Sequence, residues 1–167
     1  MKNLIATLGI TGCGKSSWLK DKSPVVETDN LRVELLGSID DITQESLIFK
    51  TAAERIIKLF DTHDTVYFGA TLVDSKYRLL FLQSIQRKCE HPFDIDLIIF
   101  PADPEISRER IKKDLDAGLP RADSLQYVDE QYTQYLYTMD QLHYEQAGYR
   151  RKFAKPFYRK IKNVEEG

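Results

Sequence analysis

The chain has 167 residues, of which 42% are hydrophobic and 30% charged, and its formal net charge is −2. This length and composition predict a single domain over residues 1–167 and exclude a disordered tail, a collagen-like repeat and a small disulfide scaffold. The two cysteines, Cys13 and Cys89, give no metal-ligand spacing, and the apolar runs are far shorter than the roughly 20 residues of a membrane helix. No signal-peptide core precedes Gly9, so we expect a cytoplasmic protein without a membrane partner.

Short apolar runs alternate along the chain with longer stretches of helical spacing. In chain order, we expect a strand at residues 3–8, a helix at 16–20, a strand at 25–28, a helix at 43–60, a strand at 65–68, a helix at 75–87, a strand at 95–100, helices at 105–115 and 124–142, and a strand near 157–161. Thr43 is the expected N-cap of its helix, and Pro104 is the expected first residue of another. Strands that alternate with helices are typical of βαβ units, so we predict an α/β three-layer sandwich around a parallel sheet of about five strands.

A glycine-rich segment follows the first expected strand. Gly9-Ile10-Thr11-Gly12-Cys13-Gly14-Lys15-Ser16 matches the pattern G-x-x-x-x-G-K-[ST] in full, with a strand before it and a helix after it. The glycines allow the backbone to wrap closely around a phosphate, and the helix start adds its positive dipole end. Lys15 is expected to reach the β- and γ-phosphates, and the Ser16 hydroxyl to ligate Mg²⁺. The residues expected to bind ATP are Gly9, Thr11, Gly12, Cys13, Gly14, Lys15, Ser16 and Ser17.

A phosphate loop indicates a nucleoside triphosphate and leaves the reaction open. The chain has no N/T-K-x-D segment, which GTPases use to recognise guanine. Motor-type ATPases usually place an acidic residue after a hydrophobic strand, whereas Gly69-Ala70-Thr71 follows the strand expected at 65–68. The sequence therefore favours a small phosphotransferase over a nucleotide-binding switch or ATPase module that transfers nothing.

Two charged residues follow the second expected strand. Asp29 lies at the carboxyl end of a strand beside the phosphate loop, where it can accept the proton of an attacking hydroxyl. Arg32 follows three residues later on the same helical face and is suited to an acceptor phosphate. Asp29 is equally suited to cap a helix over residues 31–36, so both interpretations stay open.

Four segments of the chain resemble the bacteriophage-type polynucleotide 5′-hydroxyl kinases and their wider P-loop kinase relatives. They are the loop at 7–18, the acceptor motif at 28–32, the segment at 71–78 after the third strand, and the strand and helix at 100–110. The resemblance implies an ATP-dependent kinase whose partner is a nucleic acid with a 5′-hydroxyl end. It assigns Asp29 as general base and Arg32 as the ligand of the acceptor's 3′-side phosphate. It also implies a mobile lid around residues 108–123, from which Arg108, Arg110 or Arg121 neutralises the γ-phosphate.

The chain departs from this family at two places. The family carries Asp-x-Thr where this chain has Gly69-Ala70-Thr71, with Asp74 as a candidate substitute, and the lid's usual Arg-Gly is Ala117-Gly118. Both departures concern the acceptor rather than the nucleotide. A small molecule, a nucleoside or nucleotide, and a modified DNA base therefore stay open as acceptors beside the polynucleotide.

The C-terminal part of the chain is strongly basic. Residues 150–167 contain seven basic and two acidic side chains, whereas the preceding residues contain 17 basic and 24 acidic ones. Phe153, Phe157 and Tyr158 are interleaved with the basic residues, a mixture suited to single-stranded nucleic acid. The alternative is an edge strand of the sheet that its charges protect.

Overall fold

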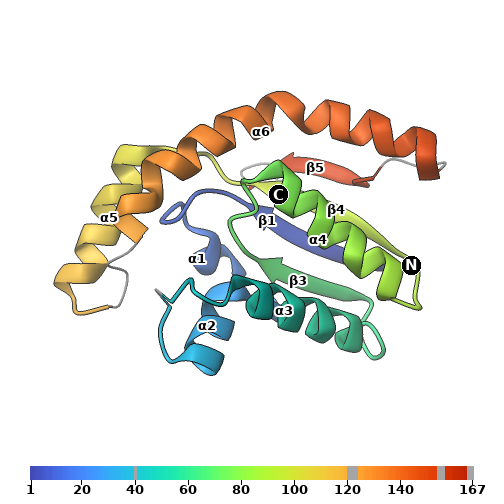
Figure 1. Cartoon of the computed structure of the whole chain (residues 1–167), viewed down its shortest axis with the longest axis horizontal. Coiled ribbons are helices and arrows are strands. Elements are labelled where there is room, and N and C mark those ends of the chain that lie inside the picture. The colour runs from blue at the N-terminus through green and yellow to red at the C-terminus, as the bar shows by residue number, and fades with distance from the viewer. Residues whose placement is uncertain (40, 120–123, 154–156, 165–167) are drawn as a thin grey trace.

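The computed structural model describes residues 1–39, 41–119, 124–153 and 157–164 (Figure 1). The side chains of residues 124 and 147–153 lie outside this description. The strands are β1 (Lys2–Leu8), β2 (Val25–Glu27), β3 (Thr65–Gly69), β4 (Phe93–Ile99) and β5 (Lys160–Asn163). The helices are α1 (Lys15–Leu19), α2 (Thr28–Leu36), α3 (Glu45–Leu59), α4 (Ser75–Lys88), α5 (Pro104–Asp116) and α6 (Ser124–Phe153).

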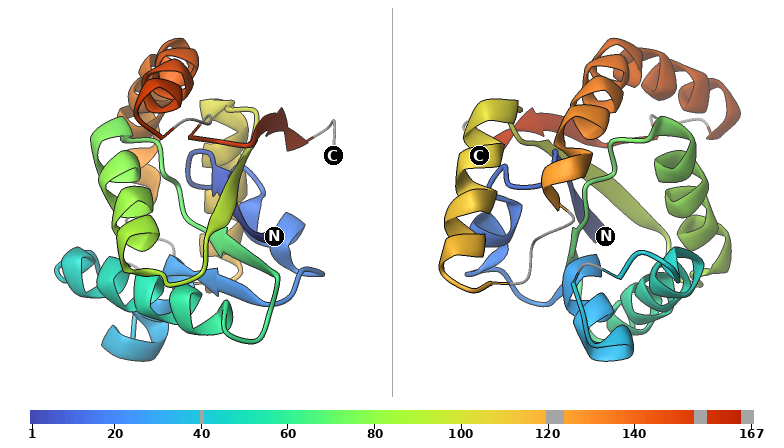
Figure 2. Two further views of the ribbon diagram at one scale, coloured as in Figure 1. Left: turned by 90° about the vertical axis from the view of Figure 1, so that its right-hand side faces the viewer. Right: turned by 60° about the vertical axis from the view of Figure 1, so that its left-hand side comes forward.

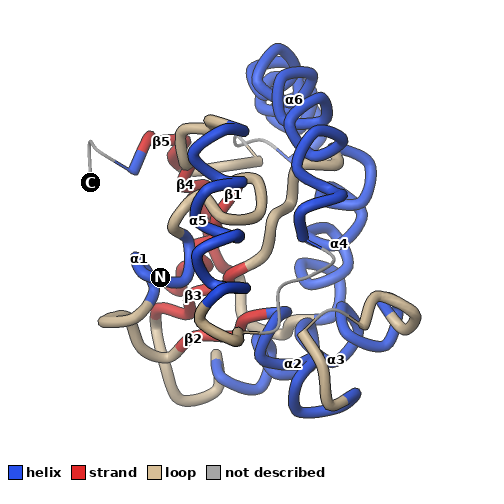
Figure 3. The backbone as a smooth tube through the Cα atoms, turned by 90° about the vertical axis from the view of Figure 1, so that its left-hand side faces the viewer, coloured by secondary structure: helices blue, strands red, loops and turns tan. Residues whose placement is uncertain are grey.

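The five strands form one sheet in the order β2-β3-β1-β4-β5, and every neighbouring pair is parallel. The central strand β1 pairs with β3 on one side and β4 on the other, with Leu4 opposite both Val66 and Ile95. Helices α1 and α5 lie on one face of the sheet, and α3 and α4 on the other (Figures 2 and 3). The prediction of a three-layer α/β fold with a parallel sheet is confirmed.

The sheet order determines where a ligand site can form. The strands β2, β3 and β1 are neighbours, so their carboxyl ends at Glu27, Gly69 and Leu8 meet at one edge of the sheet. Ligands of open α/β sheets bind beside this edge. Three segments leave the sheet there: the glycine-rich loop after β1, the first turn of α2, and residues 70–74 after β3.

Apolar packing fixes α3 and α4 over β3. Phe49 of α3 lies edge-on to Phe81 of α4, with ring centroids 5.2 Å apart, and Phe81 lies 4.9 Å from Phe68 of β3. Such aromatic contacts add to the free energy gained from burial. Among the described residues, no helix has both the length and the apolar character needed to cross a membrane.

The structure corrects several of the predicted boundaries. Helix α3 begins at Glu45, because Thr43 donates its N–H and hydroxyl to Asp41 in the turn before the helix and does not cap it. Helix α2 begins at Thr28, so Asp29 lies in its first turn and is not the N-cap. Helix α6 continues to Phe153, eleven residues beyond its predicted end, and β5 starts at residue 160 rather than 157.

The length of α6 has a tertiary cause. Gln146, past the predicted end of the helix, accepts the N–H of Tyr158 at 2.8 Å and donates to the carbonyl of the same residue. This pair of contacts holds α6 against the segment that enters β5. Side-chain contacts between residues far apart in the chain leave no periodic signal in the sequence.

Candidate active site

The glycine-rich loop has a conformation that only its glycines allow. Gly12 and Gly14 adopt φ angles of 75° and 103°, in the left-handed region that favours glycine. A Cβ on Gly9 would lie 2.6 Å from Cys13 Sγ and 2.9 Å from Phe100 Cβ. The loop therefore keeps its backbone accessible as a cradle, as expected of a phosphate-binding loop.

Lys15 lies across this cradle. Its ammonium group donates to the carbonyl oxygens of Gly9 and Ile10, both at 2.8 Å, and lies 3.6 Å from Cys13 Sγ. These partners are main-chain carbonyls that a bound phosphate can replace, since an ammonium binds an anionic oxygen more strongly than a neutral one. The geometry fits a nucleotide phosphate held between Lys15 and the loop.

The hydroxyl of Ser16 has an acidic partner that the sequence reasoning missed. Ser16 Oγ donates to Glu27 Oε2 at 3.1 Å, across the carboxyl edge of β1 and β2. Burial raises the pKa of Glu27, although the hydrogen bond from Ser16 acts in the opposite direction. Its position two residues before Asp29, at the end of a strand, is the signal that could have identified Glu27.

Ser16 and Glu27 together fit Mg²⁺. A hydroxyl and a carboxylate supply the hard oxygen ligands that this ion takes, usually together with waters and substrate phosphates. In the described part of the chain, no group of three or more His, Cys, Asp or Glu side chains forms a metal site by itself. A magnesium ion here would accordingly be shared with the phosphates.

Gly69, at the end of β3, leaves room for the side chain of Glu27 on the neighbouring strand β2. A Cβ on Gly69 would lie 2.5 Å from Leu19 Cδ1 and 2.9 Å from Glu27 Cγ. The side chain of Glu27 therefore fills the space into which an aspartate at position 69 would project. In this chain the carboxylate beside Ser16 comes from β2, whereas position 69 carries no side chain.

Asp74 is engaged differently. Its side chain caps α4 by accepting the N–H of Tyr77 at 3.1 Å, and Gln134 of α6 donates to it at 3.5 Å. A helix cap and a glutamine partner orient this carboxylate toward α4 and α6. Asp74 therefore has a structural role as a cap, whereas Glu27 is the acid beside Ser16.

Asp29 and Arg32 lie on one face of α2 and contact each other, with Arg32 Nη1 donating to Asp29 Oδ1 at 2.7 Å. A third residue joins them. Glu45, the first residue of α3, accepts from Arg32 Nε at 2.8 Å and from Nη2 at 2.6 Å. The Arg32 side chain is only 13% exposed, against 48% for Asp29 and 37% for Glu45. Burial lowers the pKa of Arg32, but the hydrogen bonds and charges of Glu45 and Asp29 outweigh it and raise the pKa above its usual value.

The two described arginines of α5 differ in what they contact. Arg110 Nη1 donates to the carbonyl of Gly12 at 3.2 Å, so its guanidinium lies against the phosphate loop. Arg108 instead pairs with Asp129 of α6 at 2.6 Å. Arg121, the third candidate, lies outside the described residues.

From α6, Gln131 accepts the N–H of Thr11 at 2.7 Å, a contact with the loop that no sequence motif indicates.

One cavity joins these groups. It has a volume of about 1330 Å³ and includes the phosphate loop, Asp29, Arg32 and Glu45 in a single lining. Helices α3 and α4 contribute Phe49, Lys50, Ala53, Leu80, Phe81 and Lys88 to the lining. The cavity therefore combines the phosphate loop with a wall of apolar side chains and two lysines, which suits two substrates that meet near Asp29.

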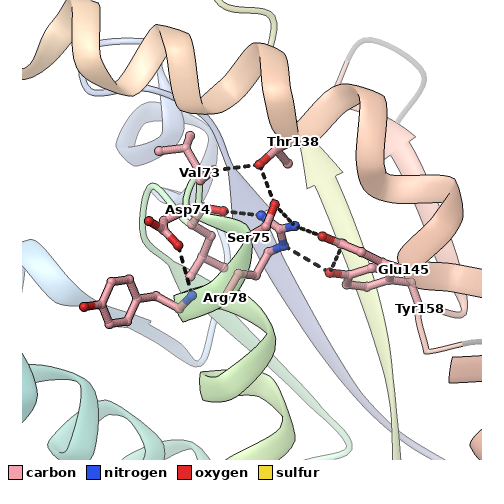
Figure 4. A network of polar contacts seen from close by, with 9 residues as sticks. Val73, Asp74, Ser75, Arg78, Thr138, Glu145 and Tyr158 are labelled. Carbon is pink, nitrogen blue, oxygen red and sulfur yellow. Dashed lines mark hydrogen bonds and ion pairs between the residues drawn. The ribbon is translucent and has the colours of Figure 1, made fainter. Parts of the chain in front are cut away.

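A buried polar network holds the segment after β3 against α6 (Figure 4). Arg78 is fully buried and donates to the carbonyl of Leu72 at 2.7 Å, to the Tyr158 hydroxyl at 3.1 Å and to Glu145 at 2.5 Å. Thr138 of α6 donates to the carbonyl of Val73 at 2.7 Å. Leu72 has a φ of 51°, unusual for a residue with a side chain, so these contacts stabilise a strained backbone.

The basic C-terminal segment is, in its described part, an edge strand with a buried entry. Phe157 and Tyr158 are 4% and 0% exposed and belong to the hydrophobic core. Arg159 forms two hydrogen bonds with the buried carboxylate of Asp96, at 2.9 and 2.6 Å. The edge-strand interpretation fits these residues, because neither aromatic ring is available for stacking on a base. The side chains of residues 147–156 lie outside the described residues.

Comparison with known proteins bears on the fold. The sequence matches no protein-family model and no curated protein. Among solved structures, a proposed kinase from Chloroflexus aurantiacus J-10-fl aligns with a TM-score of 0.62 and 14% identity, over 76% of this chain and 77% of its own. The PezAT chromosomal toxin–antitoxin system of Streptococcus pneumoniae aligns with a TM-score of 0.54 and 12% identity, over 100% of this chain and 70% of its own. At these identities the likeness shows the fold alone: the chain shares its α/β fold with these two structures.

Proposed function

We propose that the chain is an ATP- and Mg²⁺-dependent kinase that transfers the γ-phosphate to a hydroxyl group of a second substrate. The observation that carries this proposal is the cavity that Asp29 shares with the phosphate loop. Asp29 is half exposed and fixed by Arg32, so a carboxylate base is available beside the phosphates. The pairing of Asp29 with Arg32 is the feature that favours transfer over a switch or ATPase module that transfers nothing.

The residues of the site have distinct parts in the proposed reaction. Asp29 accepts the proton of the acceptor hydroxyl, and the acceptor oxygen forms a bond to the γ-phosphorus. The bond between that phosphorus and the β–γ bridging oxygen breaks, which releases ADP. Lys15 exchanges its two carbonyl partners for phosphate oxygens, and Arg110 neutralises charge from the side of α5. Ser16 and Glu27 would hold Mg²⁺, which when bound neutralises phosphate charge.

Two classes of acceptor are consistent with the site. The first is the 5′-hydroxyl of a polynucleotide, which the spacing of Asp29 and Arg32 supports and which would make a nucleic acid the partner. The second is a small molecule, a nucleoside or a modified base. Phe49, Leu80 and Phe81 in the lining of the cavity favour this class, because they offer a surface on which a ring can pack.

The test is transfer of labelled γ-phosphate from ATP and Mg²⁺ to a panel that contains a 5′-hydroxyl oligonucleotide, nucleosides and sugars. Asp29→Asn is expected to reduce transfer to the true acceptor by about a hundredfold or more, with ATP binding retained. Asp64→Asn is the matched control, since the exposed side chain of Asp64 pairs with Lys2, and Asp64 precedes β3 at the opposite end of this strand from the phosphate loop. Full transfer by the Asp29→Asn protein, or ATP hydrolysis by the native protein without transfer to any acceptor, would contradict the proposal.

A further inference from the structure

We propose that Glu45 selects acceptors with no phosphate beside the reacting hydroxyl. The acceptor is then an uncharged molecule that carries a hydroxyl group and an apolar or aromatic ring, such as an unphosphorylated nucleoside. This inference rests on the proposed kinase function and specifies its second substrate. The residue that carries it is not in any motif of the sequence.

Glu45 accepts the hydrogen bonds of the two Arg32 donors that an acceptor phosphate would need. A guanidinium binds a phosphate best through two parallel N–H donors on one edge. The Nε and Nη2 donors of Arg32 form such an edge, and both already donate to Glu45, at 2.8 and 2.6 Å. Nη1 donates to Asp29. An acceptor phosphate could bind Arg32 through these donors only by displacing a carboxylate from a largely buried guanidinium.

The charge around Arg32 opposes an anionic group as well. Asp29 and Glu45 together carry two negative charges against the single positive charge of Arg32, and Glu27 lies close enough to Asp29 to interact electrostatically with it. A phosphate placed at Arg32 itself would therefore meet these carboxylates, although Lys50 and Lys88 also belong to the lining of the cavity. Like charges in close contact disfavour binding strongly.

The neighbouring wall suits an uncharged ring. Phe49 lies one helical turn after Glu45 on α3 and is fixed edge-on against Phe81. Leu80 is half exposed and lines the same cavity from α4. A neutral ring placed against this wall would bring its hydroxyl to Asp29 without contact between an anionic group and Glu45.

The test compares transfer to adenosine and to adenosine 3′-phosphate, which offer the same 5′-hydroxyl and differ only in the phosphate. The native protein is expected to favour adenosine in kcat/KM by about tenfold or more. Glu45→Gln removes a charge and weakens the hold on Arg32, so it is expected to lower this preference by about tenfold with the KM for ATP unchanged. Glu54→Gln is the matched control, because Glu54 is an exposed residue of the same helix outside the cavity lining.

The outcomes separate this inference from the function beneath it. A native protein that favours adenosine 3′-phosphate, or a preference that Glu45→Gln leaves unchanged, would overturn the role of Glu45. Transfer to other hydroxyl compounds, but to neither adenosine nor adenosine 3′-phosphate, would overturn the acceptor class and leave the kinase proposal intact. Absence of transfer to every acceptor, with ATP bound, would overturn the kinase proposal itself.

Discussion

Replacement of Arg78 tests how the segment after β3 is held. Arg78 has no exposed surface and its partner Glu145 is 7% exposed, so Arg78→Met would leave a buried carboxylate without its counter-ion. It would also remove the donors to the Leu72 carbonyl and the Tyr158 hydroxyl. Removing one partner of a buried pair costs about 3–5 kcal/mol in the free energy of unfolding. At about 2–4 °C per kcal/mol, the expected fall in Tm is about 6–20 °C.

Denaturant titration of the native and variant proteins measures this loss directly. Lys76→Met is the control, since Lys76 is an exposed residue of the same helix, and it is expected to change the free energy of unfolding by less than about 0.5 kcal/mol. The double variant Arg78→Met, Glu145→Leu leaves no unpaired charge, so it should lose less than the sum of the two single losses. A loss of less than about 1 kcal/mol for Arg78→Met, or strict additivity in the double variant, would refute this account of the network.

Three further predictions concern the sheet and the phosphate loop. Burial raises the pKa of Asp96, but the hydrogen bonds from Arg159 and Asn3 and the nearby positive charges outweigh it and hold the pKa below its usual value. The stability that Asp96 and Arg159 contribute is therefore present above about pH 4 and is lost as the pH falls through the lowered pKa. Asp96→Asn should make the free energy of unfolding depend less on pH in this acid range, measured by circular dichroism. An unchanged pH dependence would contradict this. Arg110→Ala is expected to lower kcat by about a hundredfold and Arg108→Ala by less than about tenfold, because only Arg110 contacts the phosphate loop; equal losses would argue against that difference. Gly69→Ala should cost about 1–3 kcal/mol in the free energy of unfolding, because the added methyl group meets two packed side chains; a neutral result would show that these side chains move aside.

The sequence predicted the sheet well for a physical reason. Strands β1, β3 and β4 contain short apolar runs bounded by glycine, proline or charged residues, and such runs are readable without knowledge of their partners. Strand β5 has only one apolar residue, Ile161, and it begins three residues later than predicted. The phosphate loop was equally predictable, because its glycines and Lys15 act within one continuous segment. Asp29 and Arg32 lie three residues apart on one helix, so their contact also follows from local geometry.

The residues that the sequence did not reveal act across long separations. Glu45 of α3 contacts Arg32 of α2. From α6, Gln131 contacts the phosphate loop and Glu145 contacts Arg78 of α4. No spacing rule joins such pairs, because the turn of the chain between them decides whether they meet. Tyr158 is likewise buried with its hydroxyl bonded to Arg78 and Glu145, contacts that the composition of its segment does not indicate.

The exchange between Gly69 and Glu27 shows how a departure from a motif can be compensated in space. Read along the chain, the glycine after the third strand removes an acid from the site. In the folded protein, β2 and β3 are neighbours, with Glu27 opposite Gly69 in the parallel register. The close approach of Glu27 Cγ to the position of a Cβ on Gly69 means that only one of the two residues can carry a side chain into this space. Glu27 supplies a carboxylate beside Ser16 from β2, so the chemistry at this end of the sheet follows from the sheet register rather than from the order of residues in a motif.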